Sequence, residues 1–113
     1  NNLDTAFIKD EKKKKIIDNV LTNPIFKNIK QGKIYQEYSF NNEVDFTIGI
    51  IDLFVEYNDH IDIIDYKLSN IDPEKYKNQL LIYKEYLSKI FPNKIINCYL
   101  LSIVDNKVQK IEC

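Results

Sequence analysis

The chain has 113 residues, which is enough for one hydrophobic core but leaves no room for a separate cofactor domain. Its composition, 44% hydrophobic and 29% charged, is typical of globular proteins, and no apolar stretch reaches the ~20 residues of a membrane span. The net charge of −1 argues against a free-standing DNA-binding protein, which is usually basic. Either other parts of a larger protein hold nucleic acid, or the substrate is of another kind. The chain contains no Met, and we expect it to be a piece of a longer protein.

The N-terminal third predicts helix and then strands. Apolar residues recur at helical spacing through residues 4–30. Proline at Asn23-Pro24 disfavours continuation, so we expect a long helix followed by a short one. Residues 33–40 alternate with aromatic side chains and predict a strand, which turns at Asn41-Asn42 into a long strand over residues 44–56. A third strand is expected at residues 61–67.

The C-terminal half predicts a helix between two strands. Asp72 and Pro73 are typical of a helix start, with Asp72 as a side-chain cap, and the helix should end near Ile90. The apolar run of residues 95–104 predicts a buried strand, and residues 107–112 a last short one. A helix that joins two strands of one sheet implies a right-handed crossover and parallel pairing. The expected fold class is α/β: a helix, a three-strand antiparallel meander, a crossover helix, a parallel strand and a short terminal strand.

The hairpin register places two aspartates side by side. If residues 57–60 form a four-residue loop, Glu56 faces Ile61, and counting back along both strands puts Asp52 opposite Asp65. Their Cβ atoms would then lie roughly 4.5–5.5 Å apart. Period-2 alternation returns Lys67 to the same face.

The setting of this pair favours a metal site. The face that carries Asp52 and Asp65 is expected to be apolar, and two like charges there need compensation, which a divalent cation supplies to both. With Lys67 beside the cation, the residues predict a phosphodiesterase site. The apolar residues expected on this face are Ile48, Ile50, Phe54, Ile61 and Ile63.

A structural interpretation competes with this one. Asp52 and Asp65 could be solvent-facing acids on a half-exposed sheet, with Lys67 as their surface ion-pair partner. The opposite face of both strands is also apolar, which predicts central strands and favours the catalytic interpretation. The residues expected on that opposite face are Gly49, Ile51, Leu53, Val55, Ile64 and Tyr66.

The two cysteines indicate neither a zinc motif nor a redox motif in the sequence. Cys98 lies inside a predicted strand and is expected to be a small core residue, and Cys113 is far from it in the chain. Few cysteines suggest a reducing compartment, so we expect a cytoplasmic protein.

Three motifs in order carry a resemblance to a known family. They are Gly49-Ile50-Ile51-Asp52, Ile64-Asp65-Tyr66-Lys67, and Gln79-Leu80-Leu81-Ile82-Tyr83. Together with the element order, they resemble the PD-(D/E)XK nuclease superfamily, and more narrowly the RecB-like nuclease domain of AddA and RecB-type helicase–nucleases. The resemblance covers the chain from Glu37 onward. It implies a restriction-endonuclease-like core and one RecB-like nuclease domain over residues 1–113.

The resemblance also implies roles for individual residues. Asp52 and Asp65 would bind Mg²⁺ or Mn²⁺ with the main-chain carbonyl of Tyr66, and Lys67 would act on the attacking water and the transition state. Gln79 would brace the active site, Tyr83 would lie near the DNA backbone, and Glu37 matches an acidic residue of the preceding strand. The implied activity is Mg²⁺-dependent exonuclease cleavage of linear DNA during double-strand-break processing. The implied setting is a chain that also carries helicase domains and works with a partner subunit.

Two departures and two rivals remain open. The family carries a metal-binding His in an upstream helix, and this His has no counterpart here, because the only histidine, His60, is expected in an exposed loop. The second departure is Leu68, at a position where Thr is more frequent in the family. One rival is a stand-alone RecB-family or Cas4-like nuclease, although Cas4-like proteins usually carry four cysteines for an iron–sulfur cluster. The other is an inactive DNA-binding or protein-docking module.

Overall fold

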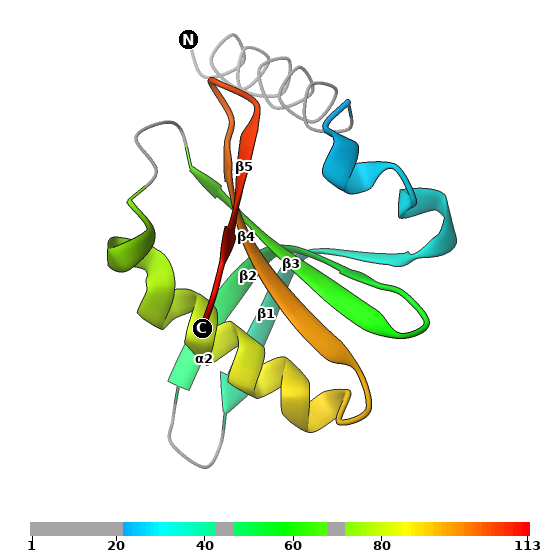
Figure 1. Cartoon of the computed structure of the whole chain (residues 1–113). Helices are drawn as coiled ribbons and strands as arrows, with labels where there is room; N and C mark the ends of the chain where they lie inside the picture. The colour runs from blue at the N-terminus through cyan, green and yellow to red at the C-terminus, as the bar shows by residue number, and fades with distance from the viewer. Residues whose placement is uncertain (1–21, 43–46, 68–71) are drawn as a thin grey trace, which may run out of the picture.

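The computed structural model describes residues 22–42, 47–67 and 72–113, which form a five-stranded mixed sheet with an α-helix across one face (Figure 1). The predicted long N-terminal helix lies outside the described residues. The predicted turn at Asn41-Asn42 is wrong, because both residues still belong to β1 and pair with Ile48 and Thr47 of β2. The elements are η1 (Pro24–Phe26), η2 (Ile29–Gln31), β1 (Lys33–Asn42), β2 (Thr47–Glu56), β3 (His60–Lys67), α2 (Pro73–Ile90), β4 (Ile95–Ser102) and β5 (Lys107–Ile111).

The strand order β1-β2-β3-β4-β5 confirms the predicted α/β arrangement. Strands β1, β2 and β3 pair antiparallel as a meander, β4 pairs parallel to β3 after the α2 crossover, and β5 pairs antiparallel to β4. Strand β3 is therefore central, with partners on both edges. Its residues from Ile61 to Asp65 are all buried, as expected for a central strand.

The predicted hairpin register is confirmed. Glu56 pairs with Ile61, and Leu53 with Ile64, so the next row sets Asp52 opposite Asp65. The loop differs in one detail, because His60 already belongs to β3 and its carbonyl accepts a hydrogen bond from Tyr57 N at 2.8 Å. The register does not change, since it depends on which residues pair and not on where the strand is counted to begin.

The predicted faces of β2 are wrong before Asp52. Both Tyr35 and Tyr38 of β1 pack on the core beneath α2, and so do Ile51 and Phe54 of β2, although strict alternation would separate each pair. Two residues instead of one therefore lie between successive inward side chains in each strand. At this row Glu37 has a φ of 48°, in the left-handed region that few non-glycine residues adopt.

This switch of face changes the surroundings of the first half of β2. Ile48 and Ile50 point away from the core and are 78% and 54% exposed, contrary to the expectation that they share the face of Asp65. Gly49 and Ile51 take the inner face instead. A Cβ on Gly49 would lie 2.7 Å from the Phe40 ring, so the absence of a side chain allows this ring to pack there.

Two apolar layers enclose the sheet. Beneath α2, the inward side chains of the strands meet Leu80, Tyr83 and Leu87 of the helix. On the other face, Phe26 of η1 packs with Leu53, Ile64 and Leu101.

Two predicted helix details need correction. The short helix expected after Pro24 consists of two 3₁₀ turns, the first of which begins where Asn23 Oδ1 accepts a hydrogen bond from Ile25 N at 3.1 Å. Asp72 holds the N-cap position of α2, but its side chain makes no capping hydrogen bond. Within the part of the chain that the structure describes, no helix is long and apolar enough to cross a membrane.

Candidate active site

Asp52, Asp65 and Lys67 meet where the middle of β2 and the C-terminal end of β3 pass beneath the N-terminal half of α2. Asp52 Oδ2 accepts a hydrogen bond from Tyr66 N at 2.9 Å. Lys67 Nζ lies 3.0 Å from Asp65 Oδ2. The Tyr76 ring of α2 covers Lys67, with 3.9 Å between the ammonium and the ring centroid. The structure thus brings together the three residues that the sequence predicts as a metal and phosphodiester site.

Asp65 is the most deeply buried charged residue of this cluster. Its residue is only 3% exposed, and burial together with the neighbouring Asp52 raises the pKa of Asp65 to about 7, although Lys67 lowers it in part. Asp65 Oδ2 is the one buried side-chain polar atom of the described residues that lacks a properly aligned hydrogen bond, because the Lys67 ammonium approaches it without that alignment. A buried carboxylate with an unfilled acceptor needs a further positive charge.

Asp52 is held by the backbone of the neighbouring strand. The regular pairing of β2 with β3 ends at Leu53, and at the next row the Tyr66 amide donates to the Asp52 side chain. This bond fixes the carboxylate beside β3. Burial, and then the Asp52 charge, raise the pKa of Tyr66 to about 12, so its hydroxyl stays protonated. The implied role of the Tyr66 carbonyl stays a prediction.

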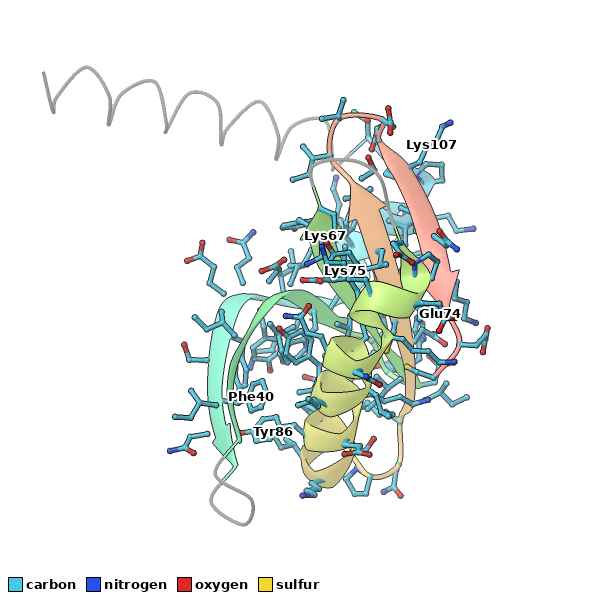
Figure 2. The ribbon with its side chains drawn as sticks, turned by 90° about the vertical axis from the view of Figure 1, so that its left-hand side faces the viewer. Phe40, Lys67, Glu74, Lys75, Tyr86 and Lys107 are labelled. Atoms are coloured by element: carbon cyan, nitrogen blue, oxygen red, sulfur yellow. The ribbon has the colours of Figure 1, made fainter. Side chains whose placement is uncertain are left out.

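Tyr76 is a site residue that the sequence did not reveal. Its spacing from Leu80, Tyr83 and Leu87 along the helix indicates only core packing. The structure instead places the ring face against the Lys67 ammonium, a geometry in which the negative ring face attracts the cation. Figure 2 shows Lys67 beside the first turns of α2, close to Lys75, whose ammonium lies 5.4 Å from the same ring. One feature of the sequence could have indicated this role. Tyr76 precedes Gln79 by three positions, so the two side chains lie on the same face of the helix.

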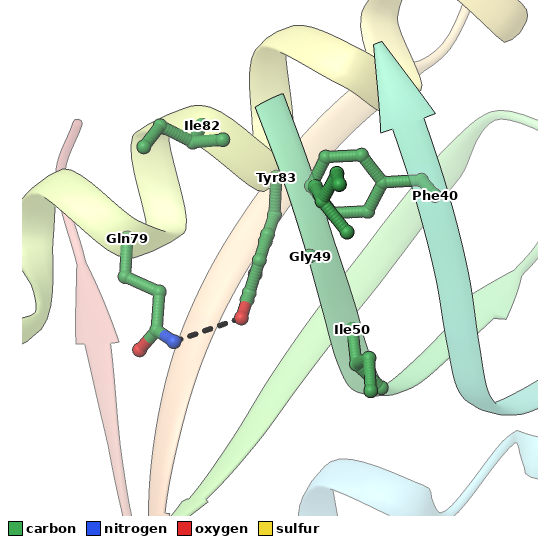
Figure 3. Close-up of a pocket in the computed structure, with 7 residues that line it drawn as sticks. Phe40, Gly49, Ile50, Gln79, Ile82 and Tyr83 are labelled. Atoms are coloured by element: carbon green, nitrogen blue, oxygen red, sulfur yellow. Dashed lines mark hydrogen bonds between the residues drawn. The ribbon is translucent and has the colours of Figure 1, made fainter. Parts of the chain in front are cut away.

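Gln79 and Tyr83 lie on the side of α2 that faces the site. Gln79 Nε2 donates to Tyr83 Oη at 2.8 Å, one helical turn further on (Figure 3). Tyr83 is 5% exposed, and its pKa is raised by burial and then by the charges of Asp65 and Asp52. The hydroxyl therefore stays protonated and lies within electrostatic reach of both carboxylates.

A groove opens beside this pair of side chains. It has a volume of about 540 Å³ and lies between α2 and the outer ends of β1 and β2 (Figure 3). Its lining is mostly apolar, apart from Gln79 and the Tyr83 hydroxyl. The lining residues are Phe40, Ile48, Gly49, Ile50, Gln79, Ile82 and Tyr83.

Glu37 and His60 are two further residues that the sequence singled out. Glu37 falls opposite Asp52, between the pairs Gln36–Leu53 and Tyr38–Ile51, but its residue is exposed. His60 lies at the far end of β3, where it is half-buried and stacks on the Tyr57 ring at 4.6 Å, so the expectation of an exposed loop residue is wrong. Among residues 22–42, 47–67 and 72–113, no three Asp, Glu, His or Cys side chains lie close enough to hold a metal ion together.

The donor set nevertheless fits a hard divalent cation. Asp52 and Asp65 offer carboxylate oxygens, which Mg²⁺ and Mn²⁺ prefer, and the buried Oδ2 of Asp65 has an unfilled acceptor. Mg²⁺ keeps several waters and is usually bound through one or two carboxylates. Two aspartates are therefore compatible with a Mg²⁺ or Mn²⁺ site.

Fold and site together define an α/β protein with a buried aspartate beside a half-buried one, an adjacent lysine and a helix that carries Gln and Tyr toward them. No protein-family model matches the chain. The chain is similar to an ATP-dependent helicase/nuclease subunit of Clostridium botulinum (strain Alaska E43 / Type E3), with 35% identity over 95 residues, which cover 65% of this chain and 8% of that protein.

Two further relatives come from Streptococcus pneumoniae. The corresponding ATP-dependent helicase/nuclease subunit of strain CGSP14 is 30% identical over 108 residues, 84% of this chain and 9% of that protein. The exonuclease/helicase subunit RexA of serotype 4 is 29% identical over the same length. The chain spans less than a tenth of the length of these relatives.

Proposed function

We propose that the chain is a RecB-like nuclease domain of the PD-(D/E)XK superfamily, with a restriction-endonuclease-like core. Its activity would be Mg²⁺-dependent exonuclease cleavage of DNA. The observation that carries the proposal is the contact of buried Asp65 with Lys67 and its closeness to Asp52, which helps to raise the pKa of Asp65. The order of the three sequence motifs and the names of the relatives support it.

Asp52 and Asp65 would hold Mg²⁺ or Mn²⁺, with the Tyr66 carbonyl as an additional ligand. When bound, the cation supplies Lewis acidity and lowers the pKa of water in its coordination shell. The protein prepares this site by keeping both carboxylates in place. The Tyr66 amide fixes Asp52, and strand pairing of Asp65 with Leu100 fixes the other.

Lys67 would orient the attacking water and offset the negative charge that develops on the phosphoryl oxygens. Its ammonium is restrained by the Asp65 carboxylate and by the Tyr76 ring. A preorganised cation is more effective than a mobile one, because no reorganisation is needed during the reaction. Gln79 would brace the Tyr83 hydroxyl, which would contact the DNA backbone. Hydrolysis would be in-line, without a covalent intermediate.

The proposed setting is a larger helicase–nuclease that degrades linear DNA from its ends during double-strand-break processing. The relatives are many times longer than this chain and are named as ATP-dependent helicase/nuclease subunits. We infer that helicase domains stand in the same polypeptide, that a second subunit takes part, and that the assembly works in the cytoplasm. DNA held by those parts would also explain why this domain needs no strongly basic surface.

The test is cleavage of linear DNA by the full-length protein that contains this chain, with Mg²⁺ and with Lys67→Ala. Lys107→Ala is the matched control, because Lys107 is an exposed lysine of β5. We expect Lys67→Ala to abolish cleavage while DNA unwinding and Mn²⁺ binding persist, and Lys107→Ala to leave cleavage unchanged. Wild-type cleavage by Lys67→Ala at saturating metal would refute the assignment and favour a non-catalytic binding module.

A further inference from the structure

The two cysteines, far apart in the sequence, meet beneath α2. Cys98 Sγ and Cys113 Sγ are 3.6 Å apart, and both thiols are free. Cys98 lies in β4, and its pairing partner in β5 is Ile111, so Cys113 follows two positions later on the same side of the ribbon. Both residues contact the core beneath α2. Antiparallel pairing therefore creates a thiol pair that neither cysteine indicates by itself.

Helix α2 holds this pair in place. Lys84 Nζ donates a hydrogen bond to the main-chain oxygen of Cys113 at 2.9 Å. One turn earlier, the Leu80 carbonyl lies 4.0 Å from Cys98 Sγ. Cys98 is 1% exposed, whereas Cys113 is half-buried and can be reached from solvent. The pair thus combines one protected thiol with one accessible thiol.

We propose that Cys98 and Cys113 form a reversible intramolecular disulfide in exchange with a small-molecule disulfide such as oxidised glutathione. A disulfide requires an S–S separation of about 2.05 Å, so the two sulfurs must approach by roughly 1.5 Å. Cys113 lies beyond Ile111, the last paired residue of β5, and its backbone can make this movement without breaking the β4–β5 ladder. The inference does not depend on nuclease activity.

The order of events follows from accessibility. The Cys113 thiolate attacks oxidised glutathione, whose S–S bond breaks, and the released glutathione thiolate takes up the proton that Cys113 lost. Cys98 then gives up its proton and attacks Cys113 Sγ, and the second glutathione leaves. In total, two protein thiols are oxidised and one oxidised glutathione is reduced to two glutathione molecules.

The half-buried Cys113 thiol reacts first for an electrostatic reason as well. Burial raises the pKa of the Cys98 thiol to about 12, so its thiolate is scarce at neutral pH. Cys98 therefore serves as the second, resolving thiol. In reducing compartments such pairs act as transient redox sensors instead of permanent crosslinks.

The disulfide would stabilise the pairing of β4 with the edge strand β5 beneath α2. The two cysteines are 15 positions apart, and closing a loop of this size restricts the unfolded chain. We expect oxidation to raise the Tm by roughly 5–15 °C. Amide exchange in β4 and β5 should slow by about tenfold or more, because opening of this strand pair becomes less frequent.

The test equilibrates the chain in glutathione buffers from fully reduced to fully oxidised, followed by acid quenching and intact mass measurement. We expect one transition that removes two hydrogen atoms and leaves no glutathione bound. Trypsin should then release residues 95–107 linked to residues 111–113. Mixed disulfides with glutathione, dimers, or persistent free thiols as the end state would overturn the proposal.

Two variants distinguish the roles of the thiols. In Cys98→Ala, glutathione should remain on Cys113 as a mixed disulfide, because no resolving thiol is present. In folded Cys113→Ser, Cys98 should take up glutathione at least about tenfold more slowly than Cys113 does in Cys98→Ala, since it is buried. Equal rates in these variants would contradict the assignment, as would an unchanged or lower Tm of the oxidised wild-type chain.

Discussion

A carboxylate–lysine pair lies at each end of the paired part of the β2–β3 hairpin, with Lys94, the residue before β4, as the lysine at the loop end. The two pairs lie in opposite electrostatic environments. At the loop end, Glu56 accepts hydrogen bonds from Lys94 at 2.7 Å and from Tyr35 at 3.2 Å. The pKa of Glu56 is lowered, and the hydrogen bond from Lys94 is the largest cause. At the other end, Lys67 lies 3.0 Å from Asp65, yet burial and Asp52 raise the pKa of Asp65 to about 7.

The difference separates a structural ion pair from a candidate active site. Glu56 has its acceptors filled, and its side chain is 21% exposed, so the pair is complete as it stands. The Asp65 side chain is 4% exposed, has a second carboxylate beside it, and retains an unfilled acceptor. The protein itself does not compensate the charge of these carboxylates in full. Such an arrangement is expected where a site binds a cation and a phosphate.

The largest expected effect is on cleavage by the full-length protein. Asp65→Asn should lower Mg²⁺-dependent cleavage of linear DNA at least about a hundredfold, because a charged ligand is lost from the site. Glu56→Gln should leave cleavage unchanged, since that carboxylate serves only the loop end. Initial rates at saturating Mg²⁺ measure both. Equal losses in the two variants would remove the distinction between the pairs.

The same substitutions should shift stability in opposite directions in the chain kept metal-free with a chelator. The pKa of Asp65 is raised from 3.8 to about 7 in the fold, so the folded chain binds more protons and its stability falls as pH rises through this range. Asp65→Asn should therefore stabilise the chain by about 1–3 kcal/mol at pH 8, and the gain should vanish near pH 4.

Glu56→Gln should change the free energy of unfolding in the opposite direction. Its pKa is lowered in the fold, so the ionised form stabilises the chain above the unfolded value of 4.5. We expect a loss of about 0–1 kcal/mol at pH 8 that disappears in acid, as for a partly exposed pair. Urea unfolding at both pH values measures the effects. If Asp65→Asn lowers the free energy of unfolding by the same amount at both pH values, the ionised Asp65 does not destabilise the fold.

A smaller effect concerns Tyr76, whose ring centroid lies 3.9 Å from the Lys67 ammonium, whereas at the Glu56 end the Phe91 ring lies 5.7 Å from the Lys94 ammonium. Tyr76→Leu removes the ring beneath the Lys67 ammonium and should lower kcat for DNA cleavage about tenfold. Tyr76→Phe keeps the ring face and should restore most of the rate. If Phe and Leu are equally impaired, the hydroxyl or general packing matters and the ring–ammonium contact does not.

The sequence predicted the register of the site and the shared face of Phe54, Ile61 and Ile63, but not the face of Ile48 and Ile50. Loop length and pairing determine which residues are opposite one another, and this part of the hairpin prediction is confirmed. The change of face before Ile50 occurs at the row where Glu37 has a left-handed conformation. Left-handed backbone is usually signalled by Gly or Asn, and Glu gives no such signal. Strict alternation therefore failed at this row.

Contacts between distant elements were the other part that could not be predicted. The Tyr76–Lys67 contact depends on how α2 crosses the sheet, and the Cys98–Cys113 contact depends on the register of β5. Neither quantity is encoded in local periodicity. The α2 crossover and parallel β4 were predictable, because a helix between two strands of one sheet allows few topologies.

Binding of Mn²⁺ to the isolated chain tests the contrast between the two ends most directly. Paramagnetic relaxation of amide NMR signals reports which end the ion approaches. We expect the signals of Tyr66 and of the residues beside Asp52 and Asp65 to broaden first, while Tyr57 and Glu56 stay sharp at the same Mn²⁺ concentration. Broadening that begins at the Glu56 end, or that leaves the Asp52–Asp65 row untouched at saturation, would contradict the assignment of the metal site.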